Sequence, residues 1–366
     1  MQEQESSRSF RVLAINPGST STKIAVFDDE TQRVESNLAH SSAELAEYEG
    51  IADQYPLRKR VILEFLHDHD IDLGSIDAVV GRGGLLHPIA GGTYEVNDRM
   101  VKDLQIGVLG EHASNLGGII ASEIAAETGV PAYIVDPVVV DELEALARPA
   151  GIPEISRSSI FHALNQKAVA RRAAAERGGR YDELNFIVVH LGGGITVGAH
   201  RRGRVVDVND GLNGEGPFTP ERSGGLPALK LLKLAFSREH DEAWLRKRIK
   251  GGGGLVAYLG TNDAREVQRR IDAGDREAAL VFEAMAYQVA KEIGAMAAVL
   301  EGRVDAILLT GGMAHSEQFC RWVERRVSFI APVEVYAGEN EMRALCEGAL
   351  RVLRGAESAQ QYRGAG

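Results

Sequence analysis

Short apolar runs separated by turn-forming residues mark the start of the chain. Apolar runs at 11–15 and 24–27 predict β-strands, and residues 33–36 predict a third extended segment. The segment 16–23, Asn-Pro-Gly-Ser-Thr-Ser-Thr-Lys, joins the first two runs. Because Gly, Pro and Ser favour turns, this pattern predicts a strand, a turn and a returning strand.

The same pattern recurs in the second half of the chain. An apolar run at 186–191 leads into Gly192, Gly193 and Gly194, and further β-like runs follow at 195–200 and 204–208. Two copies of one unit predict a duplicated protein of two lobes. We expect the Gly turns of the two lobes to face each other across the phosphates of a nucleotide, since turns rich in backbone N–H groups bind anions.

Helical and strand patterns alternate through the rest of the chain. Helical periodicity is found at 43–69, 99–109, 112–128, 158–177, 227–236, 242–250, 264–273, 276–300 and 340–353. Further strands are expected at 76–80, 93–96, 131–136, 305–309 and 333–337. This alternation predicts an α/β fold, and the Pro- and Gly-containing stretch 137–153 predicts the junction between domains.

Composition narrows the class of protein. The chain has 366 residues, 44% of them hydrophobic and 25% charged, which fits a soluble globular protein of about two domains. Its net charge of −11, without an extended basic stripe, argues against nucleic acid as a partner. Two cysteines are too few for a disulfide framework. Without a secretory pattern near Met1 or an apolar run of about 20 residues, we expect a cytoplasmic protein and no membrane partner.

Several residues could have a catalytic or binding role, and each also has a purely structural interpretation. The turn 16–23 could cradle a phosphate or simply close a hairpin, and the chain has no Walker phosphate loop. Arg82 ends a buried strand and could bind an anion or be an exposed arginine. His162 lies near a predicted helix start, where a capping or core role is common. Asp136 ends a strand, although Pro137 after it also suits a turn cap.

Long motifs resemble the acetokinase family, and within it the butyrate kinases. The turn at 16–23 resembles the first family signature. Further matching motifs lie at 80–85, 91–94, 111–117, 190–198 and 209–224. The resemblance runs from about Arg11 to about Arg354.

The resemblance implies a fold and a reaction. The fold is the two-domain architecture shared by acetate kinase, sugar kinases, Hsp70 and actin, with a nucleotide cleft between the domains. The reaction is reversible transfer of a phosphoryl group from ATP to a short-chain fatty acid with Mg²⁺, giving ADP and an acyl phosphate. The last helix then packs back on the first domain, which gives an N-terminal carboxylate-side lobe of residues 1–155 plus 340–366 and a nucleotide-binding lobe of 156–339. The resemblance also implies a homo-oligomer, a dimer or higher.

Residue roles follow from the same motifs. Arg82, Arg222, His162 and Asp136 match catalytic positions, with the two arginines stabilising the transferring phosphoryl group and His162 bonding one of its oxygens. Mg²⁺ would be held by Asp136, Asn16 and Glu341, with Glu339 as the alternative to Glu341. Nucleotide contacts are expected from Asn16, Ser19, Lys23, His190, Gly192, Gly193, Gly194, Gly311, Gly312 and Met313. Substrate contacts are expected from Arg82, Gly83, Gly84, His112 and Phe161. Where acetate kinases carry Asn, this chain has Gly193, so that phosphate contact must come from backbone N–H groups.

The chemistry of a carboxylate as phosphoryl acceptor agrees with these residue roles. A carboxylate, with a reference pKa of about 4, is ionised near neutral pH and needs no general base. Gly83 and Gly84 stand where acetate-specific relatives have bulkier residues, so we expect a pocket deep enough for butyrate, isobutyrate, valerate or propionate. Two alternatives are a kinase for a sugar or other hydroxyl, which would need an aspartate base, and a nucleotide-dependent regulatory module on the same fold.

Overall fold

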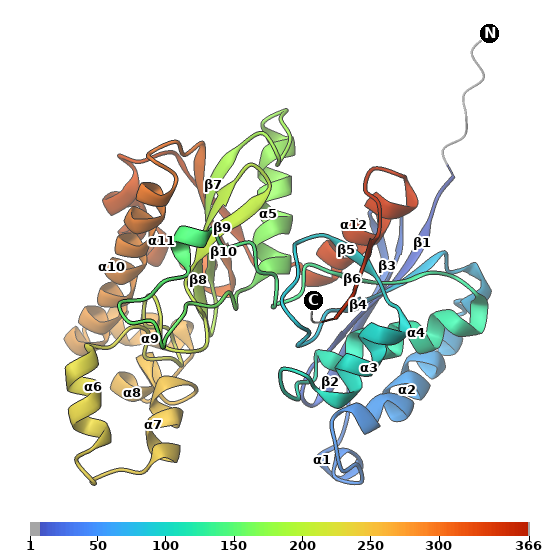
Figure 1. Ribbon diagram of the computed structural model, residues 1–366, viewed down its shortest axis with the longest axis horizontal. Coiled ribbons are helices and arrows are strands. Elements are labelled where there is room, and N and C mark those ends of the chain that lie inside the picture. The colour runs from blue at the N-terminus through green and yellow to red at the C-terminus, as the bar shows by residue number, and fades with distance from the viewer. Residues whose placement is uncertain (1–7, 365–366) are drawn as a thin grey trace. The chain divides into compact units, whose positions relative to one another are not determined.

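The computed structural model describes residues 8–364, which form two compact units (Figure 1). Unit 1 holds the chain up to Val140 and again from Asn340 onward, and unit 2 holds Asp141–Glu339. The first boundary therefore lies at 140, whereas the sequence suggested 155. The reason is that the intervening segment is bonded to unit 2, where the Glu144 N–H donates to the Val206 carbonyl at 2.9 Å.

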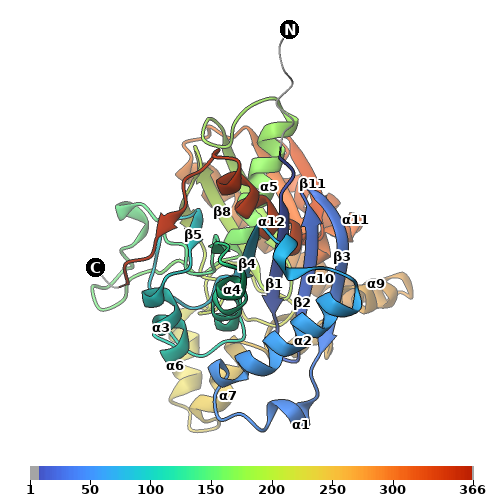
Figure 2. The same ribbon diagram turned by 90° about the vertical axis from the view of Figure 1, so that its right-hand side faces the viewer.

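Unit 1 is built on a seven-stranded mixed sheet in the order β12-β5-β6-β4-β1-β2-β3. Its strands are β1 (Arg11–Pro17), β2 (Ser21–Asp28), β3 (Thr31–Ala39), β4 (Ala78–Arg82), β5 (Thr93–Glu95), β6 (Ala132–Val135) and β12 (Gln360–Gln361). Its helices are α1 (Ser42–Leu45), α2 (Tyr55–Asp68), α3 (Asp98–Ile106), α4 (Asn115–Thr128) and α12 (Glu341–Leu353). Helices α2 and α4 pack on one face of the sheet through Ile62, Leu116 and Ile120 (Figure 2).

Unit 2 is built on a five-stranded sheet in the order β11-β10-β7-β8-β9. Its strands are β7 (Asn185–Leu191), β8 (Ile195–Arg201), β9 (Arg204–Val208), β10 (Ala306–Gly311) and β11 (Val333–Ala337). Its helices are α5 (Ala163–Glu176), α6 (Ala228–Ala235), α7 (Glu242–Ile249), α8 (Gly254–Leu259), α9 (Ala264–Asp272), α10 (Arg276–Val299) and α11 (Glu317–Val327), with a 3₁₀ turn, η4, at Gly312–His315.

Alternation along β7 explains why helices cover both faces of this sheet. Ile187 and Val189 belong to the core that includes α10 and α11, whereas Phe186 and Val188 pack against α5. Successive strand residues point to opposite faces, so a continuous apolar run is what a sheet buried on both sides requires.

The predicted duplication is confirmed by the strand pairing. In each unit the first strand pairs antiparallel with the second, which pairs antiparallel with the third. On its other side the first strand pairs parallel with β4 or β10, which in turn pairs parallel with β6 or β11. Even the register shift recurs, between Val26 and Phe27 and between Ala199 and His200.

Two local expectations were wrong. The helix expected at 43–69 is broken into α1, a 3₁₀ turn and α2, because Gly50 interrupts it and Pro56 starts a new helix. The helix expected from 158 begins only at Ala163, since the Ile160 carbonyl accepts the Gly211 N–H at 2.9 Å. Within residues 8–364 no helix is both long and apolar enough to span a membrane.

Candidate active site

Three strand ends of unit 1 bring candidate residues to one edge of its sheet. Strands β1, β4 and β6 run parallel, so their carboxyl ends lie together. Asn16 lies near the end of β1, Arg82 ends β4, and Asp136 follows β6. In open α/β sheets this edge is where ligands bind.

Asn16, Arg82 and Glu341 form one hydrogen-bonded cluster. Asn16 Nδ2 donates to Glu341 Oε2 at 2.6 Å, and Arg82 Nη1 donates to the same oxygen at 2.8 Å. Glu341 begins α12, directly after Asn340 with a φ of 45°. The returning C-terminal helix thus supplies the carboxylate that orients Arg82. Glu339, the alternative to Glu341, lies in unit 2.

Asp136 is buried and its carboxylate holds a turn. Its Oδ1 accepts the Gly92 N–H at 2.7 Å, and its own N–H donates to the Gly92 carbonyl at 3.0 Å. Its φ of 38° is unusual for a residue with a side chain. This reciprocal pairing with Gly92 accounts for the strained backbone at Asp136.

The oxygen donors of this edge suit Mg²⁺ better than a cation that needs a full protein cage. Among the described residues, no group of three or more His, Cys, Asp or Glu is arranged to hold a metal ion. Mg²⁺ keeps several waters and is held by one or two carboxylates together with substrate phosphates. Asn16, Glu341 and Asp136 therefore fit as partners of a hydrated Mg²⁺.

Arg58 supports the first turn from within the core, and sequence reasoning missed it. Its side chain is fully buried, and burial lowers the pKa of its guanidinium. It donates to five neutral oxygens: the carbonyls of Gly18, Ser19 and Ser21, Thr22 Oγ1 and Gln54 Oε1. The turn therefore rests on a buried positive charge that is bonded to neutral oxygens, which favours an anion at the turn. The one sequence signal for this role of Arg58 is the presence of an arginine on the buried face of an expected helix.

Replacing Arg58 with Lys is expected to lower the free energy of unfolding by about 3 kcal/mol. A lysine has fewer donors and no fork geometry, so it leaves several buried carbonyls without their partner. Urea unfolding followed by circular dichroism measures the effect. Arg60→Lys on the same helix is the matched control, since Arg60 is exposed and pairs with Glu64 four residues on. Equal stability of the two variants would contradict the role given to Arg58.

The other predicted site residues of unit 1 contact residues outside the cluster of Asn16, Arg82 and Glu341. Ser19 is exposed at the tip of the turn, and Lys23 forms an ion pair with Glu35 at 2.8 Å. His112 is exposed before α4, where its Nδ1 lies 2.8 Å from Ser114 Oγ. Neither Lys23 nor His112 is tied by these contacts to the cluster of Asn16, Arg82 and Glu341.

The space beside Gly83 and Gly84 is filled by protein. A Cβ on Gly83 would lie 2.5 Å from Pro137 Cβ, and one on Gly84 would lie 2.5 Å from the Asn115 Cα. The expectation that these glycines deepen a pocket by leaving it empty is therefore wrong. They let the start of α4 and the turn after β6 approach Arg82 closely.

Unit 2 presents a matching edge with a cavity. Strands β7, β10 and β11 are parallel, and they end near His190, Gly311 and Gly338. A cavity of about 1030 Å³ lies beside this edge. Its lining includes the predicted nucleotide residues Gly192, Gly193, Gly312 and Met313, together with Glu221, Asn262, Asp263, Arg265 and Arg269, which sequence reasoning missed. The second Gly turn and the turn after β10 thus border one space.

Position 311 can be occupied only by glycine without a local shift of the backbone. Its φ is 89°, and a Cβ there would lie 2.4 Å from the Leu191 carbonyl oxygen. Gly312 has open space where a Cβ would stand, so its bare backbone faces outward.

His162 and His190 stack on each other beside the second Gly turn. Their ring centroids are 3.8 Å apart and nearly parallel, at 9°. His162 Nδ1 lies 2.9 Å from Thr196 Oγ1, and His190 Nδ1 lies 2.7 Å from Asn165 Oδ1. Phe161, before His162, is buried. His162 occupies the N-cap position of α5 without a capping bond from its side chain, and its carbonyl accepts the Gln166 N–H at 2.9 Å.

Arg222 reaches the same turn from the loop 209–224. Its Nη1 donates to the Gly211 carbonyl at 2.5 Å, and burial lowers the pKa of its guanidinium despite the opposing charges of Glu221 and Asp210. A Cβ on Gly194 would lie 1.9 Å from Arg222 Nη1. Gly194 must therefore be glycine for the guanidinium to lie against the turn.

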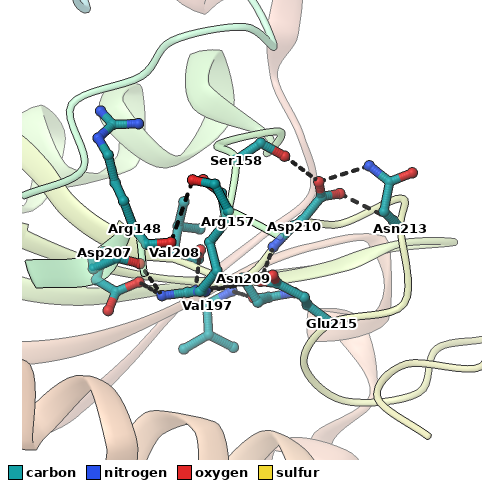
Figure 3. Close-up of polar contacts among 12 residues, drawn as sticks. Arg148, Arg157, Ser158, Val197, Asp207, Val208, Asn209, Asp210, Asn213 and Glu215 are labelled. Atoms are coloured by element: carbon teal, nitrogen blue, oxygen red, sulfur yellow. Dashed lines mark hydrogen bonds and ion pairs between the residues drawn. The ribbon is translucent and has the colours of Figure 1, made fainter. Parts of the chain in front are cut away.

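A polar network fixes the start of this loop (Figure 3). Asn209 Oδ1 accepts the Val197 N–H at 2.7 Å, and Asp210 Oδ2 accepts from Ser158 Oγ at 2.9 Å. Arg157 donates to Asp207 at 2.9 Å and lies 3.3 Å from Glu215 (Figure 3). Burial disfavours the charge of Arg157, but these two carboxylates outweigh it and raise its pKa. The loop that presents Arg222 is thus rigidly held.

The duplicated fold, with a glycine-containing turn in each half, defines a two-domain α/β protein. The chain belongs to the acetokinase family, whose profile matches residues 154–342. It is 57% identical to butyrate kinase 2 and to butyrate kinase 1 of Clostridium acetobutylicum, over 97% of this chain and 99% and 100% of those proteins. The crystal structure of Porphyromonas gingivalis acetate kinase has the same fold, with a TM-score of 0.77 at 20% identity, covering 93% of this chain and 99% of that one.

Proposed function

We propose that this protein is a carboxyl-acceptor kinase that transfers a phosphoryl group from ATP to butyrate or a similar short-chain fatty acid, reversibly. The observation that carries the proposal is the near-full-length 57% identity to two butyrate kinases. The cluster around Arg82 and the glycine-lined cavity of unit 2 support it, because they offer an anion site and a nucleotide site.

In this proposal the basic residues bind the anionic groups of the two substrates. Arg82, held by Glu341, binds the substrate carboxylate with its planar guanidinium. Arg222 and His162 stabilise charge on the transferring phosphoryl group, and the Gly192–Gly194 turn offers backbone N–H groups to the nucleotide phosphates. The carboxylate attacks phosphorus in line, the bond to ADP breaks, and no proton has to be removed from the acceptor.

ATP and Mg²⁺ are the proposed cofactors. When bound, Mg²⁺ neutralises phosphate charge, and Asn16, Asp136 and Glu341 would orient its water shell. In this proposal the adenosine part of ATP binds in the cavity lined by Gly312 and Met313, next to Gly311. We further propose a cytoplasmic enzyme that assembles as a homo-oligomer.

The alternatives are less well supported. A hydroxyl kinase needs a free carboxylate as general base, whereas Glu341 is engaged by Arg82 and Asp136 by Gly92. A nucleotide-dependent regulatory module would hydrolyse ATP without dependence on an acid. Membership of the acetokinase family favours the carboxyl acceptor over both.

Trapping with hydroxylamine in the presence of ATP, Mg²⁺ and acids of increasing length tests the proposal. We expect kcat/KM for butyrate to exceed that for acetate by about tenfold, since each buried CH₂ contributes about 0.8 kcal/mol. Isobutyrate, valerate and propionate serve as the comparison set. The highest kcat/KM for acetate would contradict the proposed acid, and no hydroxamate with any acid would contradict the proposed reaction.

A further inference from the structure

A buried chain of hydrogen bonds runs from the interior of unit 2 to His162. Tyr181 OH lies 2.8 Å from His200 Nδ1, and His200 Nε2 lies 3.0 Å from Gln166 Oε1. Gln166 Nε2 then donates to both the carbonyl and the hydroxyl of Thr196, at 3.0 and 2.8 Å. Thr196 Oγ1 lies 2.9 Å from His162 Nδ1. Gln166, Thr196 and His200 are all fully buried.

The direction of each bond is set by chemistry. The Thr196 carbonyl can only accept, so the side-chain amide of Gln166 must turn its NH₂ toward Thr196 and its oxygen toward His200. His200 Nε2 must then carry a proton. Because Thr196 Oγ1 accepts from Gln166, its own hydrogen is available for His162 Nδ1.

We propose that Gln166 and Thr196 are positioning residues that hold His162 with its proton on Nε2. The ring then presents an N–H donor on the side away from Thr196. An N–H donor is what a hydrogen bond to a phosphoryl oxygen requires. The catalytic use of this N–H donor rests on the proposed function. The position of the proton on His162 rests on the hydrogen bonds alone.

The stacked His190 has the opposite arrangement and serves as an internal reference. Asn165 Nδ2 donates to the Glu339 carbonyl at 3.0 Å, which leaves Asn165 Oδ1 to accept from His190 Nδ1. His190 therefore carries a proton on Nδ1, and its Nε2 lies 3.5 Å from Glu339 Oε1, a carboxylate oxygen that would pair with a second proton on the ring. Two neighbouring rings of the same type should thus differ in which nitrogen is protonated.

Nitrogen-15 NMR of the histidine-labelled full chain tests the proposal directly. At a pH where both rings are neutral, His162 should show an unprotonated Nδ1 and His190 a protonated Nδ1, with His162→Gln and His190→Gln assigning the signals. Gln166→Met removes the donor to Thr196, so Thr196 Oγ1 no longer has to donate to His162 and the preference for a proton on His162 Nε2 should weaken. A protonated Nδ1 on His162 in the unaltered chain would overturn the proposal.

Kinetics supply a second readout. Thr196→Val should lower kcat about tenfold or more with little change in KM, as is usual when a group that orients a ligating or catalytic histidine is lost. Thr196→Ser keeps the hydroxyl and should retain activity. Equal kcat for Thr196→Val and Thr196→Ser would overturn the positioning role, whereas absence of acyl phosphate with the unaltered chain would bear on the proposed function alone.

Discussion

Replacing Arg222 with Lys is expected to lower kcat for acyl phosphate formation about 10³-fold, the lower part of the range for arginines that stabilise a transferring phosphoryl group. The guanidinium lies against Gly194 and donates to the Gly211 carbonyl, and this arrangement directs its remaining donors. A lysine keeps the charge but has a single nitrogen, so it cannot bond Gly211 and a phosphoryl oxygen in the same planar geometry. Initial rates at saturating ATP and acid measure the effect.

The matched control is Arg246→Lys on α7. Arg246 is exposed and pairs with Glu242 four residues before it, so its replacement should leave kcat within about twofold. Circular dichroism should show that both variants fold. A folded Arg222→Lys variant with the kcat of the control would contradict the role assigned to Arg222.

Replacing Arg82 with Gln is expected to lower kcat/KM for the fatty acid by about 10² to 10⁴-fold. The variant loses the hydrogen bonds of the guanidinium to the substrate carboxylate, each worth about 1.5–3 kcal/mol, and leaves Glu341 without its ion-pair partner. Here the remaining charge, Glu341, would repel the substrate carboxylate as well. Steady-state kinetics with varied acid separate this effect from any change in KM for ATP.

The double variant Arg82→Gln/Glu341→Gln tests that explanation. With the repelling carboxylate removed, part of the loss in affinity for the acid should be recovered, although kcat should remain low because Arg82 is absent. If the double variant has a higher KM for the acid than Arg82→Gln alone, repulsion by Glu341 is not the cause.

Much of the fold was predictable because the two halves repeat one pattern. The apolar runs on either side of residues 16–23 and 192–194 predicted both hairpins, and the matched order of strands followed. Short buried strands such as β10 are visible in sequence because both of their faces are apolar. Helix boundaries were less predictable, since the start of α5 depends on the distant contact between Ile160 and Gly211.

The candidate site was only partly predictable, because several of its contacts also join residues that are distant in the sequence. Residues at strand ends, such as Arg82 and His190, are recognisable from their place in the pattern and from the family motifs. Arg58, Gln166 and Thr196 act through contacts with residues many positions away, and apart from the place of Arg58 on an expected helix nothing in their local sequence shows this. The packing of Pro137 and Asn115 against Gly83 and Gly84 was equally hidden.

Phosphorus-31 NMR of a reaction containing ATP, Mg²⁺ and butyrate labelled with oxygen-18 in its carboxyl group tests the central claim most directly. If a carboxylate oxygen attacks the transferred phosphorus, the acyl phosphate signal must show the isotope shift of a bridging oxygen-18, and ADP must form in step with it. ADP and inorganic phosphate forming at the same rate with and without butyrate, with no labelled acyl phosphate, would contradict the account.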